Sequence, residues 1–553
     1  MRMSFESDSL DRFDLPLHEM VSARILDAVR NPSSVIIDLY DEGRNTQTEF
    51  PPHVTSHFST VFDTQDSVQQ IPPLSLNHPP TVHPDRSLVR FRAMIQDISS
   101  PEMYLSRLPG GRCGGWNIYQ DITTPGSADI NLRDLRERSV FWAITVPGES
   151  QWHAGRLERT LFNKAPDVPS IPPYITSNCH KLPNPRSTDF GVFLKIYDEA
   201  LTKDLKFMTV ATFVGILAWE SIGTETEAES LALPVLHVTN VQVPTPESPP
   251  EPPRNTVTAV YENLVDWVSQ EALAGDKVAA EFVILCSVAR VQSRNPPILP
   301  PSLQLTGVPR PNNGSSTPAI CSILSKLLPL FSVVGLSLEA LNNDRFVPES
   351  NGEDLSSGYL QVPAGSVVLL TEIGIKEGNI IEKGVRNLRD VQHVMSNQSL
   401  RCVFPFSQFS FHTDIGFILI VEGRRSPFFT TDISLPLQPQ IKDTTRLYKD
   451  ESEIKMPDHQ QLDAFRDLLS GAKRGKNLTV SKQVAELIEH DFVEERKVDK
   501  SVTQHDLATK ITIARLLGRL FRADELSIDL WERAKGLEAE RKKRSQVQGM
   551  AAN

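Results

Sequence analysis

Hydrophobic and polar positions follow two different rhythms along this chain, and the change of rhythm separates its regions. Near the N-terminus an apolar residue recurs at every fourth position, at Leu17, Val21, Ile25 and Val29. This spacing predicts one amphipathic helix that ends near Asn31-Pro32. Proline pairs are frequent from residue 50 to 86. Residues 1–86 are therefore predicted to be a helix followed by proline-rich loops.

From residue 87 to 241 the pattern changes to short, apolar runs with partial alternation. The runs are Leu88–Asp97, Val140–Val146, Gly191–Tyr197 and Ala211–Leu217. Several short strands in succession predict an antiparallel barrel of the OB type. Residues 147–188 are rich in Pro, Ser and Asn without a strong period, which indicates a flexible insertion in that barrel. Closely spaced prolines then predict a linker over 242–255.

Residues 256–445 alternate between helical periodicity and buried-strand runs. Helical patterns occupy 257–291, 319–331 and 384–396, and strand patterns occupy 303–307, 333–338, 366–370 and 415–421. A hairpin is predicted at 400–412. Strands that alternate with helices predict a mainly parallel, doubly wound sheet. The fold class is thus mixed α/β and β, multidomain, with a barrel before an α/β module.

Residues 446–544 are predicted to be helical, followed by a tail at 545–553. Thr503 with Asp506 three positions later has the form of a capping box at a helix start. This helical region ends with four consecutive cations, Arg541, Lys542, Lys543 and Arg544. A terminal, exposed run of this kind is a candidate nuclear-import signal, and the alternative is a solvated helix end.

Composition narrows the function classes. The formal net charge of −12 over 553 residues disfavours a broad nucleic-acid-binding surface, which needs clustered Lys and Arg. The five cysteines are scattered without a CxxC pair, so no zinc site or disulfide framework is expected. The longest apolar runs are shorter than a bilayer span, and a soluble intracellular protein without metal or cofactor is expected.

Several motifs, in a consistent order, resemble the MCM-binding protein family, which is related to the subunits of the minichromosome maintenance (MCM) helicase. The motifs are Phe91–Asp97, Val146–Ser150, Leu194–Tyr197, Asn342–Pro348, Leu360–Gly365 and Gly384–Leu388. The resemblance implies an OB-fold joined to a degenerate AAA+-like module, with residues 446–544 as its helical lid, in a nuclear protein that binds MCM subunits. It also implies a role in helicase assembly, removal from chromatin and sister-chromatid cohesion, with chromatin association through those subunits.

The positions at which an AAA+ ATPase would hold nucleotide lack their usual residues. The strand before Glu372 ends at Thr371 where a Mg²⁺-binding carboxylate is expected. Loop 307–317 contains no lysine, and only Arg310 offers a cation. In the helicases a polar sensor residue, Asn, follows the strand that corresponds to 415–421, and here that position is Glu422. The arginine that the helicase lid contributes to the nucleotide site is replaced by His505. We therefore expect no catalysis and no bound nucleotide.

The predicted hairpin corresponds to the element with which helicases touch DNA. Phe404, Phe406 and Phe409 lie at its tip without a lysine, which favours packing internally or against a protein partner over base stacking. Asp97 and Glu149 are expected to have structural roles. The expected function is a non-catalytic binding protein of the MCM complex in the nucleus. The alternatives are a divergent ATPase or helicase subunit, and a single-stranded-DNA-binding replication factor that acts through the barrel.

Overall fold

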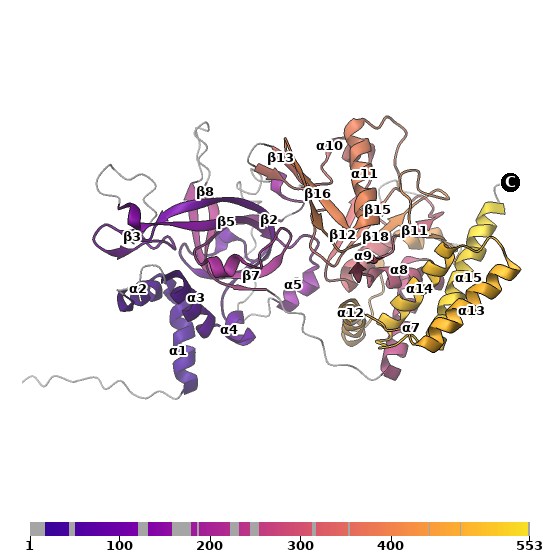
Figure 1. Ribbon diagram of the computed structural model, residues 1–553, viewed down its shortest axis with the longest axis horizontal. Coiled ribbons are helices and arrows are strands. Elements are labelled where there is room, and N and C mark those ends of the chain that lie inside the picture. Colours follow the sequence, from indigo (N-terminus) through magenta and orange to yellow (C-terminus); the bar gives the residue numbers. More distant parts are fainter. Residues whose placement is uncertain are drawn as a thin grey trace, which may run out of the picture.

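The chain forms a mixed α/β, multidomain protein. The computed structural model describes residues 17–43, 50–119, 131–157, 179–184, 187, 189–221, 232–243, 254–311, 317–351, 354–441, 443–475 and 477–550. The N-terminal helices and a β-barrel occupy one end of the molecule, and an α/β sheet with the C-terminal helices occupies the other (Figure 1).

Helices precede the barrel. They are α1 (Leu17–Arg30), α2 (Pro32–Glu42), α3 (Phe50–Val61) and α4 (Gln65–Gln69), followed by β1 (Pro73–Leu74) and a 3-10 turn at Pro80–Val82. The predicted helix that ends near Asn31 is confirmed. The prediction of loops is wrong for α3 and α4, because Pro51 and Pro52 lie in the first turn of α3, where a missing N–H costs nothing, whereas residues 70–86 are mostly turns and loops. Val54 and Phe58 are fully buried in a core shared with the barrel.

Five long strands close into a barrel. They are β2 (Leu88–Leu105), β5 (Leu135–Thr145), β6 (Gly191–Ile196), β7 (Val210–Ser221) and β8 (Ala232–Gln242). They neighbour one another in the order β2-β5-β6-β8-β7, and β7 pairs back onto β2. The pair β6–β8 is parallel, and the other four pairs are antiparallel. A small ribbon of β3 (Arg107–Leu108) and β4 (Arg112–Cys113) extends from the barrel.

The start of the predicted insertion is ordered and packs on the α/β sheet. The Phe331 amide donates to the Gly148 carbonyl at 2.8 Å, and the Ser150 amide donates to the Pro329 carbonyl at 2.9 Å. Helix α5 (Gln151–Leu157) and a 3-10 turn at Cys179–Lys181 follow. Residues 147–157 are thus not a flexible segment. Residues 158–178, and 244–253 of the predicted linker, lie outside the described residues.

A five-stranded, wholly parallel sheet forms the second unit. Its strands are β11 (Leu303–Thr306), β12 (Phe331–Gly335), β15 (Ser366–Thr371), β18 (Ile415–Ile420) and β19 (Ile433–Pro436), in the order β12-β15-β18-β11-β19. Its helices are α7 (Arg254–Ala272), α8 (Lys277–Ser287), α9 (Ala319–Leu327), α10 (Leu338–Asn343) and α11 (Glu382–Asn397). The predicted parallel, doubly wound sheet is confirmed. Helix α9 ends four residues earlier than the pattern to Phe331 predicted, because Phe331 begins β12.

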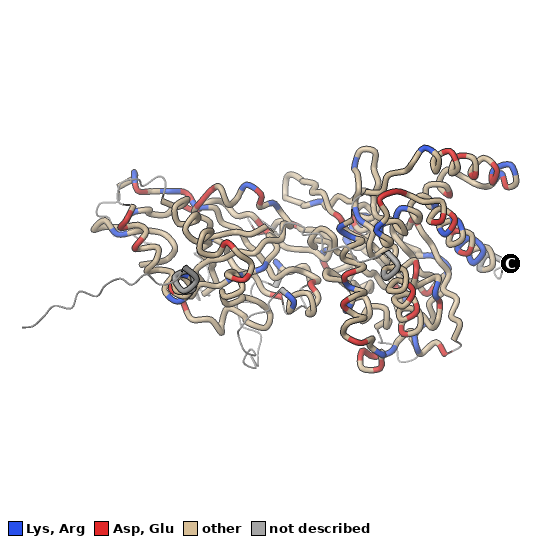
Figure 2. The backbone as a smooth tube through the Cα atoms, turned by 90° about the horizontal axis from the view of Figure 1, so that it is seen from below, with Lys and Arg blue, Asp and Glu red and all other residues tan. Residues whose placement is uncertain are grey.

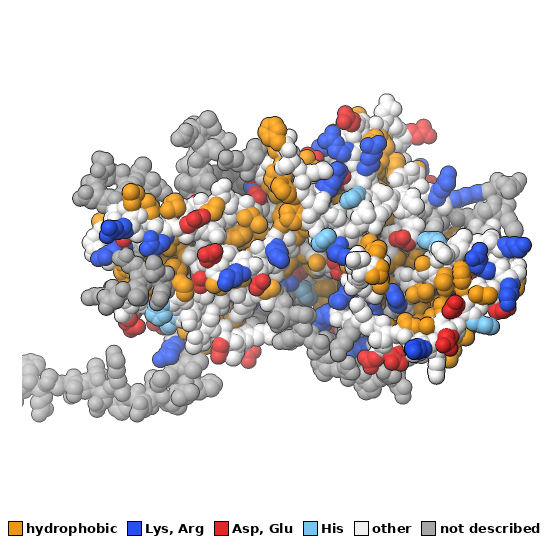
Figure 3. Space-filling view, in the orientation of Figure 1, with side chains coloured by type: hydrophobic (Ala, Val, Ile, Leu, Met, Phe, Trp, Pro, Cys, Tyr) orange, Lys and Arg blue, Asp and Glu red, His pale blue; other side chains and the backbone are white. Residues whose placement is uncertain are grey.

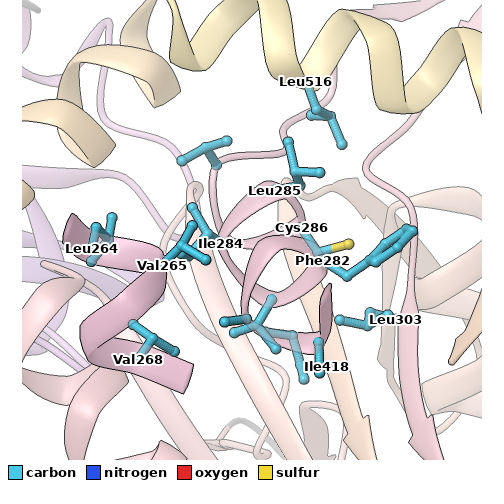
Figure 4. Packing of buried hydrophobic residues seen from close by; sticks show 14 of the residues in the cluster. Leu264, Val265, Val268, Phe282, Ile284, Leu285, Cys286, Leu303, Ile418 and Leu516 are labelled. Carbon is cyan, nitrogen blue, oxygen red and sulfur yellow. The ribbon is translucent and has the colours of Figure 1, made fainter. Parts of the chain in front are cut away.

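Both faces of this sheet are covered, so its strands are apolar throughout. Val367 and Leu369 of β15 face the core with α7, α8 and α9, whereas Val368 and Leu370 face the core with α11. Figure 4 shows α8 side chains, including Phe282, directed toward β11 and β18. The core between the sheet and α11 also contains Met94, Trp142 and Ile144 of the barrel, so the barrel and the sheet share one cluster of buried side chains.

A smaller sheet lies where the barrel meets the parallel sheet. Its strands, in spatial order, are β14 (Asp354–Ser356), β13 (Glu349–Asn351), β16 (Ser399–Val403) and β17 (Gln408–His412). The predicted hairpin at 400–412 is confirmed as β16 and β17. A short antiparallel ribbon of β9 (Ser293–Arg294) and β10 (Pro297–Ile298) follows α8 in the sequence.

The C-terminal helices pack on α7, α8 and α9. After 3-10 turns at Thr444–Tyr448 and Glu451–Glu453 they are α12 (His459–Arg474), α13 (Lys482–Val498), α14 (Gln504–Leu520) and α15 (Ile528–Met550). The capping box of Thr503 with Asp506 is confirmed. The predicted tail from 545 is wrong as far as Met550, because α15 continues. Basic and acidic positions are interspersed along the backbone of these helices (Figure 2).

Candidate functional site

The carboxyl ends of β11, β15 and β18 meet at one edge of the parallel sheet, which is where ligands bind in open α/β sheets. The Glu372 amide donates to the Ile420 carbonyl at 3.0 Å, which places the ends of β15 and β18 together. Loop 307–311, Glu372 and Glu422 therefore gather at this edge. The juxtaposition predicted for the nucleotide positions is present, and the question is what these residues can hold.

The amide groups at the start of the loop after β11 form hydrogen bonds within the protein. The Gly307 amide donates to the Gly423 carbonyl at 3.0 Å, and the Val308 amide donates to the Val421 carbonyl at 3.1 Å. Pro309 and Pro311 have no amide hydrogen. A phosphate cradle is made of free backbone N–H groups, and of residues 307–311 only Arg310 has an amide that is not already bonded in this way. This part of the loop does not fit a phosphate; residues 312–316 lie outside the described residues.

The cation of this loop is paired with the residue at the sensor position. Arg310 Nε lies 2.6 Å from Glu422 Oε2, and their side chains are 62% and 38% exposed. The guanidinium is thus directed to a carboxylate that would repel the γ-phosphate of a nucleotide. Behind this pair, the Tyr448 hydroxyl donates to the Pro309 carbonyl, and burial raises the pKa of Tyr448 to about 12. Arg310 and Glu422 thus neutralise each other's charge at the edge of the sheet.

Glu372 is buried and held by a loop from the neighbouring strand. The Ser426 hydroxyl donates to Glu372 Oε1 at 2.5 Å, and Ser426 Oγ accepts the amides of Phe428 and Phe429 at 3.0 and 2.9 Å. The residue is 7% exposed, and burial raises the pKa of its carboxyl to about 7. A general base must reach its water, and Mg²⁺ prefers several oxygen ligands. With Thr371 before it, Glu372 meets neither requirement.

The remaining predicted nucleotide residue is separate from this edge. His505 is exposed in the first turn of α14, where the Thr503–Asp506 capping box fixes the helix start. Asp506 also forms an ion pair with Lys542 of α15 at 2.7 Å. Among the hydrogen bonds of the described residues, none joins the His505 side chain to the sheet edge. Thr371, Glu372, Arg310 and Glu422 are brought together, and His505 is not.

The basic run is not the exposed segment that the sequence predicts. Arg544 is buried, with its Nη1 at 3.0 and 2.8 Å from the two carboxyl oxygens of Asp276 at the start of α8. Arg541 pairs with the buried Glu538 at 2.6 Å. Lys542 is 33% exposed and Lys543 is 76% exposed. The expectation of four accessible cations is wrong, because one face of α15 packs on the α/β unit.

The two acidic residues of the family motifs have structural roles, as predicted. Asp97 Oδ2 accepts a hydrogen bond from the Lys181 ammonium, with Nζ at 3.0 Å. Glu149 accepts Arg92 Nε at 3.1 Å and His153 Nδ1 at 2.8 Å. Burial alone would raise the pKa of Glu149, but the bonds from His153 and Arg92 outweigh it and lower that pKa. These ionic contacts tie the barrel to the segments that follow it.

A buried polar chain in the barrel was missed from the sequence, since its members are scattered. The Tyr197 hydroxyl lies 2.7 Å from His237 Nδ1, His237 Nε2 lies 2.9 Å from Glu220 Oε1, and Lys195 Nζ lies 2.6 Å from Glu220 Oε2. Burial alone would raise the pKa of Glu220, but His237 and Lys195 lower it to about 2. Tyr197 and His237 are 6% and 0% exposed, so no substrate reaches them. The chain joins β6, β7 and β8.

In the part of the chain that the structure describes, the geometry indicates neither a metal site nor a membrane-spanning helix. Among the residues that the structure describes, no three His, Cys, Asp or Glu side chains are placed to hold a metal ion together. No described helix combines the length and the apolar composition that crossing a bilayer requires. Cys113, Cys286, Cys321 and Cys402 are buried free thiols, and burial raises the pKa of each.

Comparison with known proteins gives a consistent result. Residues 58–171 and 163–545 match the family described as "Mini-chromosome maintenance replisome factor". The zebrafish (Danio rerio) protein named "Mini-chromosome maintenance complex-binding protein" is 26% identical, over 94% of this chain and 98% of its own length. The Arabidopsis thaliana protein of the same name is 23% identical over 89% of this chain and 93% of its own. The Homo sapiens protein of that name is 29% identical over 50% of this chain and 43% of its own.

Proposed function

Since the chain belongs to the Mini-chromosome maintenance replisome factor family, we propose that it is a non-catalytic binding protein of the MCM complex. The observation that carries the proposal is the closed edge of the parallel sheet. The strands converge as they would for a nucleotide, but the amides of Gly307 and Val308 are bonded internally and Arg310 is paired with Glu422. An architecture kept without its chemistry fits a protein that binds other subunits.

We further propose that the two units are an OB-type barrel and a degenerate AAA+ module with a helical lid. The barrel strands, numbered along the chain, close in the order first, second, third, fifth, fourth, which is the order of an OB-fold. The parallel sheet has the order second, third, fourth, first, fifth, which is the order of AAA+ ATPase sheets. On this proposal the chain imitates a helicase subunit and uses the surfaces with which such subunits meet one another.

The absence of catalysis is tested with Mg²⁺-ATP on the purified full chain. We expect no saturable binding at millimolar nucleotide and no hydrolysis above background. Glu372→Gln should leave the background rate unchanged. A turnover that disappears in Glu372→Gln would show a working ATPase and overturn this part of the proposal.

Binding is tested by titrating the full chain with purified MCM subunits. Two apolar side chains of α13, Val493 and Val498, are 46% and 91% exposed, and they are the lid positions at which we test such contact. Val493→Asp and Val498→Asp should weaken the complex, whereas Leu132→Asp, at a residue that is 78% exposed in the 3-10 turn before β5, should not. A chain that binds no MCM subunit would overturn the proposed function. Equal binding by all three variants would remove only the lid from the interface.

We also propose a nuclear location and a role in DNA replication, through helicase assembly or removal from chromatin and through sister-chromatid cohesion. Family membership supports these roles. The import candidate is now restricted to Lys542 and Lys543, because Arg544 supports the fold. Changing both lysines to Ala should move the protein toward the cytoplasm, and an unchanged location would mean that another signal or a bound partner carries it. Depletion of the protein should change the amount of chromatin-bound MCM.

A further inference from the structure

The tip of the β16–β17 hairpin exposes aromatic side chains that the fold does not cover. Phe406 is 102% exposed and Phe409 is 56% exposed. Phe404 contacts Phe409 edge-on with ring centroids 5.6 Å apart, and Phe411 lies 4.6 Å from Phe207 of the barrel. Figure 3 shows a ridge of hydrophobic side chains between the barrel and the α/β unit, in the region of β13 and β16. Exposed aromatic groups of this kind mark a contact surface.

Strand β17 is also an open edge. It is the last strand of the sheet β14-β13-β16-β17. The amide of Phe404 bonds to the Ser407 carbonyl at 2.8 Å, and the amide of Thr413 bonds to the Gln398 carbonyl at 3.0 Å. In an antiparallel ladder, bonded and non-bonded pairs alternate. Counting from both ends, Phe409 and Phe411 bond to β16.

The backbone groups of Gln408, Ser410 and His412 therefore point away from β16. Among the described residues, none of these three amides or carbonyls has a backbone partner outside the strand pair. The five paired positions are in continuous register without a bulge. The strand also has no Lys and no Pro, which are common protections of an edge. An unprotected edge beside exposed aromatic side chains is a template for another strand.

We propose that β17 is a docking edge for an extended segment of an MCM-type partner, which adds a strand beside Ser410 and places apolar side chains against Phe409. This inference rests on the proposed function and adds one defined surface to the contacts that the function requires. The partner strand would carry apolar residues at alternate positions, because successive side chains of a strand face opposite sides of the sheet.

A second copy of the chain fits this edge less well. Five residues span about 17 Å of strand, so two such edges bury far less than the roughly 1,200–2,000 Å² of a stable specific interface. The net charge of −12 also opposes self-association. A partner that already contacts the module elsewhere needs only a small addition from this edge.

Single-stranded DNA is also disfavoured at this hairpin. Arg401 is the only Lys or Arg between Ser399 and His412, and it pairs with the buried carboxylate of Asp390. Stacking proteins combine aromatic rings with a positively charged groove that follows the backbone. The hairpin has the rings without the free cations.

Ser410 allows a matched test, because its amide points outward. Ser410→Pro removes that amide and places a ring in the path of an added strand, yet it breaks no bond to β16. Ser410→Ala keeps the amide and is the control. Both variants should match the wild type in circular dichroism and thermal melting. Phe406→Ser and Phe409→Ser remove the aromatic surface without touching the ladder.

The full-length variants are titrated with purified MCM subunits. Ser410→Pro, and the two Phe variants, should weaken binding about tenfold or more, and Ser410→Ala should bind as the wild type does. Hydrogen exchange of peptides that cover residues 404–413 should slow on binding. If the wild type binds and Ser410→Pro equals Ser410→Ala, the docking edge is wrong while the proposed function stands. Wild type that binds no MCM subunit contradicts the proposed function itself.

Two further measurements test whether the edge binds a second copy of the chain or single-stranded DNA instead. Sedimentation of the chain alone should show a monomer at micromolar concentration, and a dimer that Ser410→Pro dissolves would assign the edge to a second copy. A labelled single-stranded oligonucleotide should not bind through the hairpin, and binding lost in Phe406→Ser would assign the tip to DNA. Either result overturns the proposal.

Discussion

Arg544→Ala should destabilise the contact between α15 and α8 strongly, although Arg544 belongs to a run of cations near the C-terminus. Its guanidinium lies 2.8 Å from Asp276 Oδ2, and the two side chains are 5% and 0% exposed. Removing one partner of a buried ion pair leaves an uncompensated charge, which costs about 3–5 kcal/mol. Asp276 keeps two amide donors, from Ala279 and Gln438, so we expect the lower end, about 3 kcal/mol.

Lys543 provides the matched control in the same helix turn. Its side chain is 76% exposed, and its contact with Glu540 is long at 3.9 Å. Lys543→Ala should therefore change the free energy of unfolding by less than about 0.5 kcal/mol. Asp276→Asn combined with Arg544→Ala should be more stable than Arg544→Ala alone, because no buried ion is left without its partner.

The assay is hydrogen exchange on peptides from α8 and α15, since a multidomain chain need not unfold in one step. A loss of about 3 kcal/mol corresponds to exchange roughly 100-fold faster at the amides protected by this contact. Lys543→Ala should exchange as the wild type does. Equal exchange in Arg544→Ala and Lys543→Ala would refute the argument that burial of the Asp276 pair holds α15 in place.

Three further variants test other contacts. Burial raises the pKa of Glu372 to about 7, so this carboxyl binds its proton more tightly in the folded chain, and wild-type stability should fall as the pH rises from 4.5 to about 7. Glu372→Gln should remove this fall, and the variant should melt at a higher temperature than the wild type at pH 8 but not at pH 4. Glu377→Gln, at an exposed residue, is the control. Gln361 is fully buried and donates to a barrel carbonyl at 2.8 Å, so Gln361→Ala should cost about 1–3 kcal/mol in urea unfolding. A Cβ at Gly191 would lie 2.2 Å from the Trp142 ring, so Gly191→Ala should lower the melting temperature, and an unchanged melt would mean that the ring moves aside freely.

Elements whose signal is local were predicted well. The strand at 366–371 is buried on both faces, and a continuous apolar run is typical of such a strand. The stripe of α11 has the period of a helix, and the capping box at Thr503 depends on residues three positions apart. The positions of the degenerate nucleotide residues followed from the same strands.

Features that depend on distant partners were not predictable in this way. Helix α3 was missed because proline pairs usually break a helix, although Val54 and Phe58 at a four-residue spacing were a usable signal. Burial of Arg544 depends on Asp276, and no local pattern shows that pairing. The internal bonding of Gly307 and Val308 likewise depends on β18, more than a hundred residues later.

The pair of Asp276 and Arg544 also sets an order of events during synthesis. The two residues are 268 positions apart. At about 5–20 residues per second, the ribosome makes Arg544 roughly 13 to 54 s after Asp276. During that interval the faces of α7, α8 and α9 that α12, α14 and α15 later cover are present without their cover. We therefore expect a nascent chain of this protein to expose these apolar residues until α15 has been made, and its yield in cells should depend on chaperones that shield them.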